Sequence, residues 1–198
     1  MMSPREQTEK PRRADAQENR RHLLEVANKV FMKEGPDASL EEIARRAEVG
    51  IGTLYRHFPT RSDLIEEVYA EQIEVLISRA NELADTLSPK EALTAWLRAL
   101  AEHTAKYKAL KACLLAVRNK DGVDQRQWKE RLRAAAGRLL SAAEKAGAVR
   151  PGLDPVALLS LVHGITVAAE KTPDSARRME EFLQIMIDGL TSTGQRDS

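Results

Sequence analysis

The sequence predicts an all-α protein of about nine helices, and three observations lead to that prediction. Apolar residues recur every three or four positions along most of the chain, which is the period of an amphipathic helix. A serine or threonine followed three positions later by an acid, the pattern of a helix N-terminus, occurs at Ser39, Thr60 and Ser88. The composition, 42% hydrophobic and 31% charged, is that of a soluble globular protein that favours helices.

Charge and cysteine content limit the classes of protein that fit. The 198 residues are enough for one or two domains with a sizeable core. The net charge of +1 excludes a basic nucleic-acid coat, although residues 10–61 hold eleven positive and eight negative side chains, a local excess of +3. Cys113 is the only cysteine, which excludes an intramolecular disulfide and a cysteine-based zinc site. No histidine and acid cluster has metal-ligand spacing, so we expect neither a metal nor a cofactor.

The chain is expected to be cytoplasmic and to make no membrane contact. Its N-terminus carries no apolar signal segment. The longest apolar stretch, residues 156–169, is interrupted by polar residues and is shorter than the roughly 20 residues that a bilayer requires.

The first residues are polar and carry charges of both signs, so we expect a mobile arm over residues 1–16. The basic run from Lys10 to Arg13 can follow a phosphate backbone or enter a minor groove, and a solvated tail explains it equally well. The first helix is expected from about Gln17 to Glu34, and Gly35 with Pro36 supplies its stop.

Two short helices joined by a tight turn are predicted between Ser39 and Pro59. Ser39 and Glu42 form a capping box for the first helix, whose inward face consists of Leu40, Ile43, Ala44 and Ala47. In the second helix Leu54 and Phe58 point inward, while the outer face carries Thr53, Tyr55, Arg56 and His57. Pro59 ends it, since proline has no amide hydrogen. Two helices joined in this way form a helix-turn-helix, whose second helix can enter the DNA major groove.

The run Leu40-Glu-Glu-Ile-Ala-Arg-Arg-Ala, followed by Val49 and by Gly52-Thr-Leu-Tyr-Arg-His-Phe-Pro, resembles the DNA-binding domain of TetR/AcrR-family repressors. The resemblance extends from about residue 20 to residue 69. It implies a helix-turn-helix DNA-binding domain over residues 17–63 and a C-terminal ligand-binding and dimerisation domain over residues 64–198. One position departs from the family: Glu48 stands where glycine is usual, in a turn that we expect to need a positive φ.

The resemblance also implies which residues meet DNA. Ile51, at the leading end of the second helix, can touch thymine methyl groups, and Arg56 can reach a base or a phosphate. Arg61, at the start of the following helix, can hold a phosphate together with nearby amides. Arg45, like its neighbour Arg46, is equally explained as solvated surface. The predicted DNA-binding residues are Arg45, Gly50, Ile51, Gly52, Thr53, Tyr55, Arg56, His57 and Arg61.

The remaining helices are expected in the C-terminal domain. A helix that begins near Arg61 keeps its apolar pattern for about 26 residues, roughly 39 Å, and in the family such a rod transmits movement between the domains. Further helices are expected after Ser88, over residues 107–119, after a turn at residues 121–124, after Asp154 and after Pro173. The break near residue 106 is implied by the family alone.

The last two helices carry apolar residues on more than one face, which indicates burial against a second copy of the chain. The family dimerises through these helices as a four-helix bundle. The predicted homodimer interface consists of Leu158, Leu161, Val162, Ile165, Phe182, Ile185 and Met186.

Polar and aromatic residues on apolar faces of the C-terminal helices predict a pocket for an unknown small-molecule effector. The candidates are Trp96, Leu100, His103, Tyr107, Cys113, Val117, Trp128, Leu132, His163 and Thr166. Ordinary core packing with hydrogen-bonded histidines explains each of them as well.

Three hypotheses about function follow. The first is a transcriptional repressor that binds a palindromic double-stranded DNA operator as a homodimer and is released by an effector. The second is a DNA-binding dimer without a small-molecule ligand, and ligand-induced loss of DNA binding would separate these two. The third is a helical enzyme or interaction module, for which the sequence offers no nucleophile–base pair and no glycine-rich phosphate loop. A salt-dependent shift of a promoter fragment would exclude it.

Overall fold

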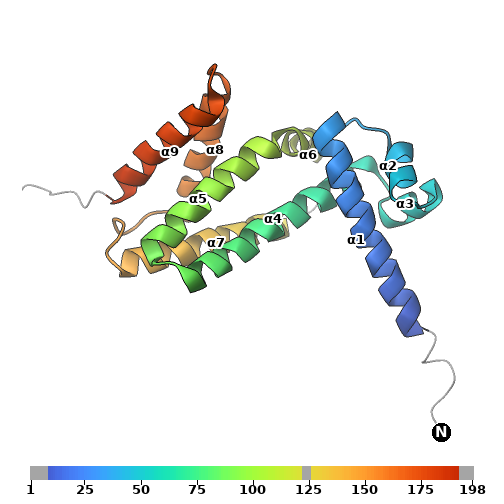
Figure 1. The fold of residues 1–198 in the computed structure, drawn as a ribbon, viewed down its shortest axis with the longest axis horizontal. Helices are drawn as coiled ribbons and strands as arrows, with labels where there is room; N and C mark the ends of the chain where they lie inside the picture. The colour runs from blue at the N-terminus through green and yellow to red at the C-terminus, as the bar shows by residue number, and fades with distance from the viewer. Residues whose placement is uncertain (1–8, 122–125, 192–198) are drawn as a thin grey trace, which may run out of the picture. The chain divides into compact units, whose positions relative to one another are not determined.

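A computed structural model of the chain describes the backbone of residues 9–121 and 126–191, and the side chains of residues 17–114 and 127–191. Within these ranges it holds nine α-helices and no strand, which confirms the predicted all-α class (Figure 1). The helices are α1 (Glu9–Glu34), α2 (Leu40–Arg46), α3 (Ile51–His57), α4 (Arg61–Thr86), α5 (Pro89–Lys106), α6 (Lys108–Asp121), α7 (Arg126–Lys145), α8 (Pro155–Glu170) and α9 (Ser175–Thr191). None of those described is both long and apolar enough to cross a membrane.

The chain folds into two compact units, and α4 contributes to both of them. The first unit holds the described parts of Met1–Ala70 and Ala109–Val123, and the second holds Glu71–Lys108 and the described residues from 126 onward. The division therefore lies inside α4 rather than after residue 63, and most of α6 belongs with the first unit. An amphipathic stripe indicates that a helix is buried but not against which neighbour, so the sequence could not place α6.

The first helix is longer than predicted. α1 begins at Glu9 rather than near Gln17, so residues 9–16, which were expected in the arm, are helical. Pro11 is compatible with this start, because the amides of the first helical turn have no intrahelical acceptor. The residues after Pro11 are mostly alanine, glutamine, glutamate and arginine, which favour helices.

In the first unit α2 packs against both α1 and α3. The core that they enclose is apolar, and its most deeply buried side chains include Leu23, Ala27, Val30, Ile43, Leu54 and Phe58. The inward orientation predicted for Leu54 and Phe58 is confirmed. Because these two side chains hold one side of α3 in the core, the opposite side of α3 faces outward.

The predicted helix caps are confirmed at α4, α5 and α8. At α4 the amides of Thr60 and Asp63 each donate to the other residue's side chain, at 2.9 and 3.1 Å. At α5, Ser88 and Glu91 form a capping box with a proline in the first turn. At α8 the Asp154 carboxylate accepts a backbone amide hydrogen at 3.0 Å. The break between α5 and α6 is also confirmed, at residue 107.

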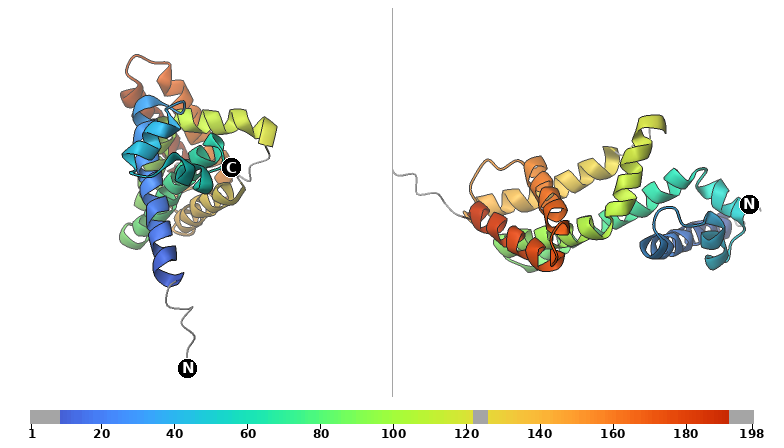
Figure 2. Two further views of the ribbon diagram at one scale, coloured as in Figure 1. Left: turned by 90° about the vertical axis from the view of Figure 1, so that its right-hand side faces the viewer. Right: turned by 90° about the horizontal axis from the view of Figure 1, so that it is seen from above.

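In the second unit α5 packs against α7, α8 and α9 (Figure 1). Its buried face includes Leu93, Trp96, Leu97, Leu100 and His103, the stripe predicted from the sequence. Figure 2 shows α8 and α9 side by side, as their contacts also indicate. The predicted turn at residues 121–124 lies, from residue 122 onward, outside the described residues.

Candidate nucleic-acid interface

The outward side of α3 is the candidate nucleic-acid interface. Leu54 and Phe58 expose 0% and 1% of their surface, whereas Ile51 and Tyr55 expose 37% and 44%. The other predicted contacts on or beside α3 are also at least partly accessible: Gly50, Gly52 and Arg56 are exposed, and Thr53 and His57 are half-buried. Every residue predicted on this helix as a DNA contact is therefore at least partly accessible.

The side chains of this surface are suited to contact the phosphates and base edges of a DNA duplex. The first turn of α3 holds no acid, and its last turn carries Arg56 and His57. Ile51 offers an apolar contact for a thymine methyl group, and the Tyr55 hydroxyl can donate a hydrogen bond to a phosphate or a base. A Cβ added at Gly52 would meet no atom of the protein within 4 Å. Packing inside the protein therefore does not require a glycine at this position. A glycine would be required if the backbone of another molecule approached it closely.

The turn between α2 and α3 is a Schellman motif. The amide of Glu48 donates to the carbonyl of Arg45 at 3.2 Å, and the amide of Val49 donates to the carbonyl of Ala44 at 3.0 Å. In a Schellman motif the residue after the C-cap, here Glu48, adopts the left-handed conformation. Glu48 accordingly has a φ of 56°. The predicted positive φ is confirmed. A glutamate occupies it at a conformational cost on the order of 1 kcal/mol relative to glycine.

Glu48→Gly is expected to raise the melting temperature by about 2–4 °C, because removing about 1 kcal/mol of strain has that effect in a chain of this size. Thermal unfolding followed by circular dichroism measures it. Glu48→Ala is the matched control, since it removes the same charge but keeps the Cβ that causes the strain. An equal gain in both variants would show that charge, not backbone strain, limits stability at this turn.

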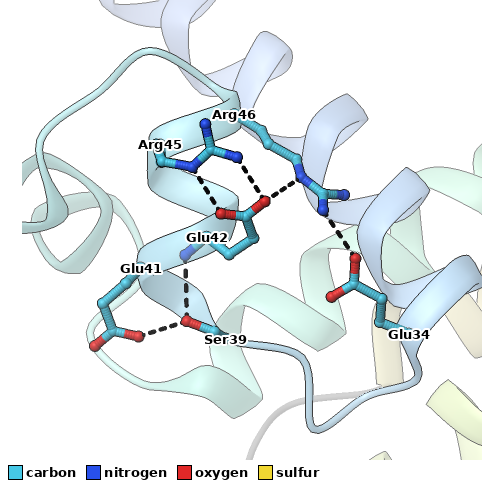
Figure 3. Close-up of polar contacts among 6 residues, drawn as sticks. All are labelled: Glu34, Ser39, Glu41, Glu42, Arg45 and Arg46. Carbon is cyan, nitrogen blue, oxygen red and sulfur yellow. Dashed lines mark hydrogen bonds and ion pairs between the residues drawn. The ribbon is translucent and has the colours of Figure 1, made fainter.

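Charged side chains on α2 form a connected cluster (Figure 3). The Glu42 carboxylate accepts from Nε and Nη2 of Arg45 at 2.7 and 2.8 Å, and from Nε of Arg46 at 2.6 Å. Arg46 also binds Glu34 of α1 at 3.0 Å. The hydrogen bonds from Arg45 and then Arg46 lower the pKa of Glu42 to about 2, so this carboxylate is ionised at neutral pH.

The capping box predicted at α2 is only half formed. The Ser39 hydroxyl accepts from the amide of Glu42 at 3.2 Å, as predicted. The Glu42 carboxylate, however, contacts the two arginines instead of reaching back to the start of the helix. A charged guanidinium is a stronger partner for a carboxylate than a neutral amide is. The sequence pattern of a capping box does not show that arginines compete for the same carboxylate.

Arg61 makes structural contacts that the sequence did not predict. Its side chain is half-buried, and its Nη1 donates to the carbonyls of Pro36 and Ala38 at 3.0 and 2.5 Å. These bonds fasten the start of α4 to the loop between α1 and α2. Arg61 therefore stabilises the helix-turn-helix through Nη1, one of its three guanidinium nitrogens, and its contact with a phosphate stays a prediction.

An apolar surface runs along α8 and α9. Leu161 and Ile185 expose 53% and 69% of their surface, which is unusual for large apolar side chains. A hollow of about 710 Å³ lies beside Leu161, lined by Ala157, Ser160, Leu161, Gly164, Ile165, Ala168 and Phe182. Ile165, Phe182 and Met186 are half-buried at this surface, as an interface requires. Leu158 and Val162, by contrast, expose only 3% and 0%, so they belong to the core of a single chain.

The small residues that line this hollow were not among the predicted interface residues. Ser160, Gly164 and Ala168 follow one another at intervals of four on α8, which lets another helix approach closely. That spacing was present in the sequence, where the larger apolar residues beside it dominated the pattern.

The predicted effector pocket is only partly assembled in the second unit. His103 in the last turn of α5 and Tyr107, the residue after that helix, lie together with ring centroids 4.7 Å apart. The Tyr107 hydroxyl donates to Oε1 of Gln72 at 2.8 Å. Gln72 was not predicted, because it belongs to no periodic pattern. Leu100 and Leu132 are buried, and Trp128 is half-buried. Trp96 is fully buried and donates its indole hydrogen to the carbonyl of Leu76 at 2.9 Å.

Other predicted pocket residues lie elsewhere. His163 is exposed on α8 and does not line a buried site. Thr166 is buried, but its hydroxyl donates to the carbonyl of His163 within its own helix at 2.7 Å. Cys113 is half-buried and belongs to the first unit, where burial raises the pKa of its thiol. The side chain of Val117 lies outside the described residues.

Known proteins resemble the chain along its described length. A family model described as "Transcriptional regulator SbtR-like, C-terminal domain" matches residues 88–192, and one described as "Bacterial regulatory proteins, tetR family" matches residues 23–68. An HTH-type transcriptional regulator of Staphylococcus aureus is 36% identical over 110 residues, which make up 54% of this chain and 60% of that protein. The chain thus aligns with less than two thirds of the length of this curated relative.

Two solved structures match the chain over a larger share of its length than this curated relative does. A TetR transcriptional regulator from Streptomyces coelicolor has 35% sequence identity and a TM-score of 0.72, covering 88% of this chain and 99% of its own. A TetR transcription regulatory protein from Mycobacterium vanbaalenii has 33% identity and a TM-score of 0.69, covering 90% and 98%.

Proposed function

Because the chain belongs to the TetR family of bacterial transcriptional regulators, whose helix-turn-helix binds DNA, we propose that it is a repressor that binds a palindromic operator as a homodimer. We further propose that a small molecule bound in the second unit releases the operator. The observation that carries the proposal is the exposure of Ile51, Tyr55 and Arg56 on α3, while the buried Leu54 and Phe58 hold the helix against the core. A recognition helix has to offer such a face to the major groove.

The apolar surface of α8 and α9 supports the homodimer. Leu161 and Ile185 are large apolar side chains that are mostly exposed, and a hollow lined mostly by small residues lies beside Leu161. A second copy of the same surface would cover both side chains and the hollow. A twofold dimer presents two α3 helices related by symmetry, so the preferred DNA site should be a palindrome or close to one.

Three polar side chains near the end of α5 support an effector site in the second unit. His103, Tyr107 and Gln72 place hydrogen-bonding groups among apolar walls, which is the composition of a small-molecule site. An effector can act only by binding one conformation of the protein better than another. We expect negative coupling between effector and operator on the order of 1–3 kcal/mol.

Arg56→Ala and Tyr55→Phe are expected to weaken operator binding, Arg56→Ala by about tenfold or more, because each removes a polar contact from both copies of α3. Fluorescence anisotropy with a labelled duplex that the wild-type chain enriches from a random pool measures the affinity. Arg79→Ala is the matched control, since Arg79 is exposed on α4 in the second unit. If Arg56→Ala bound as tightly as Arg79→Ala, α3 would not be the helix that reads DNA through this residue.

A further inference from the structure

The charge of α2 is balanced within the helix itself. In a helix-turn-helix the first helix crosses the DNA backbone, so positive charge there meets phosphates whatever the base sequence. α2 carries Arg45 and Arg46 but also Glu41 and Glu42, and both arginines donate to the single carboxylate of Glu42 (Figure 3). The two positive charges of α2 are therefore paired with a carboxylate of the same helix.

The two arginines differ in what they do for the fold. Arg46 connects α2 to α1 through Glu34, at 3.0 Å. Arg45 binds only within α2, three residues from Glu42, and its side chain is 72% exposed. An exposed pair at this spacing contributes little to helix stability. The two-nitrogen contact of Arg45 with Glu42 therefore has a small structural benefit, although it occupies the more exposed of the two arginines on α2.

We propose that Glu42 is a positioning and specificity residue for DNA binding, which holds Arg45 away from phosphates and so suppresses sequence-independent attraction to DNA. The inference rests on the proposed function. Non-specific binding is almost entirely electrostatic, so neutralising a backbone-facing arginine lowers it while the base contacts of α3 remain. Specificity is the ratio of these two affinities and rises as the non-specific affinity falls.

The proposal has a quantitative signature in the salt dependence of binding. Each phosphate that a cation neutralises adds about −0.9 to the slope of log K against log salt. One additional contact therefore increases the loss of affinity between 50 and 200 mM salt by about 3.5-fold. A role of Glu42 in folding alone would change thermal stability without changing this slope.

The experiment measures the binding of the full chain to a labelled duplex of random sequence at several salt concentrations. E42Q frees Arg45, so it is expected to bind more tightly than the wild type at 50 mM salt and to steepen the slope by about 0.9 per protomer. In the double variant E42Q/R45Q the gain should disappear, because the freed arginine is gone. R45Q alone should leave the slope of the wild type unchanged, since its charge is already neutralised.

E41Q is the matched control, because it removes the same charge from the neighbouring residue. The Glu41 carboxylate contacts the hydroxyl of Ser39 at 2.8 Å instead of an arginine. E41Q should therefore leave the slope unchanged. An equal steepening in E41Q and E42Q would overturn the proposal, since net charge alone would then explain the effect.

The remaining outcomes are also decisive. If R45Q made the slope of the otherwise wild-type protein shallower by about 0.9, Arg45 would contact a phosphate despite Glu42, and the proposal would fail even if E42Q did not fold. If the wild type enriched a specific site but shared its slope with E42Q, only the role of Glu42 would be overturned. A wild-type chain that retained no duplex of any sequence would overturn the proposed function as well.

Discussion

Trp96→Ala is expected to lower the free energy of unfolding by about 3–5 kcal/mol, which is the usual cost of truncating a fully buried tryptophan. Trp96 has none of its surface exposed, and its indole hydrogen bonds to the carbonyl of Leu76, which ties α5 to α4. Its removal leaves a cavity and loses that bond. The midpoint of urea unfolding, with the slope of the transition, measures the change.

Trp128→Ala is the matched control for this prediction. Trp128 is only half-buried on α7, so its truncation should cost distinctly less than that of Trp96. The sequence placed both tryptophans in the effector pocket. If Trp96→Ala were as stable as the wild type but no longer released DNA in response to an effector, Trp96 would line the ligand site and its assignment to the core would be wrong.

The double variant Leu161→Glu with Ile185→Glu is expected to convert the proposed dimer to a monomer of 22.1 kDa and to abolish operator binding. Four carboxylates would enter an apolar interface in each dimer, where an unpaired charge costs several kcal/mol. In a single chain the two side chains are 53% and 69% exposed, so folding should survive the change. Light scattering after size exclusion gives the mass, and circular dichroism verifies the fold.

Val75→Glu is the matched control for the double variant. Val75 is 58% exposed on α4, away from the apolar surface of α8 and α9. It should tolerate the charge, so this variant should stay dimeric and bind the operator normally. A folded double variant that kept the dimer mass would place the interface on other helices.

Much of the fold could be predicted from local patterns. Leu54 and Phe58 were identified as inward-facing because helical periodicity fixes the relative direction of residues four apart. The caps at Thr60, Ser88 and Asp154 were predicted because they involve neighbours in the sequence. The strained turn at Glu48 was found for the same reason, since its conformation depends on a few adjacent residues.

The errors concern partners that local patterns do not specify. Glu42 was assigned to a cap, but in three dimensions two arginines compete for its carboxylate. For Arg61 the sequence could not show that a loop more than twenty residues earlier in the chain supplies acceptors for its Nη1. Val162 was assigned to the dimer interface, yet α8 is apolar on several sides and its sequence could not show which side the chain itself covers.

The most direct test of the account is to sequence the duplexes that the wild-type chain retains from a random pool at near-physiological salt. A homodimer reading DNA with two symmetry-related α3 helices predicts an enriched palindrome or near-palindrome. Its half-sites should be centred about one helical turn apart, roughly 34–36 Å, or a multiple of that spacing. Retention without any enriched sequence, or enrichment of a single half-site without its symmetry mate, would contradict the claim that this chain is a dimeric operator-binding repressor.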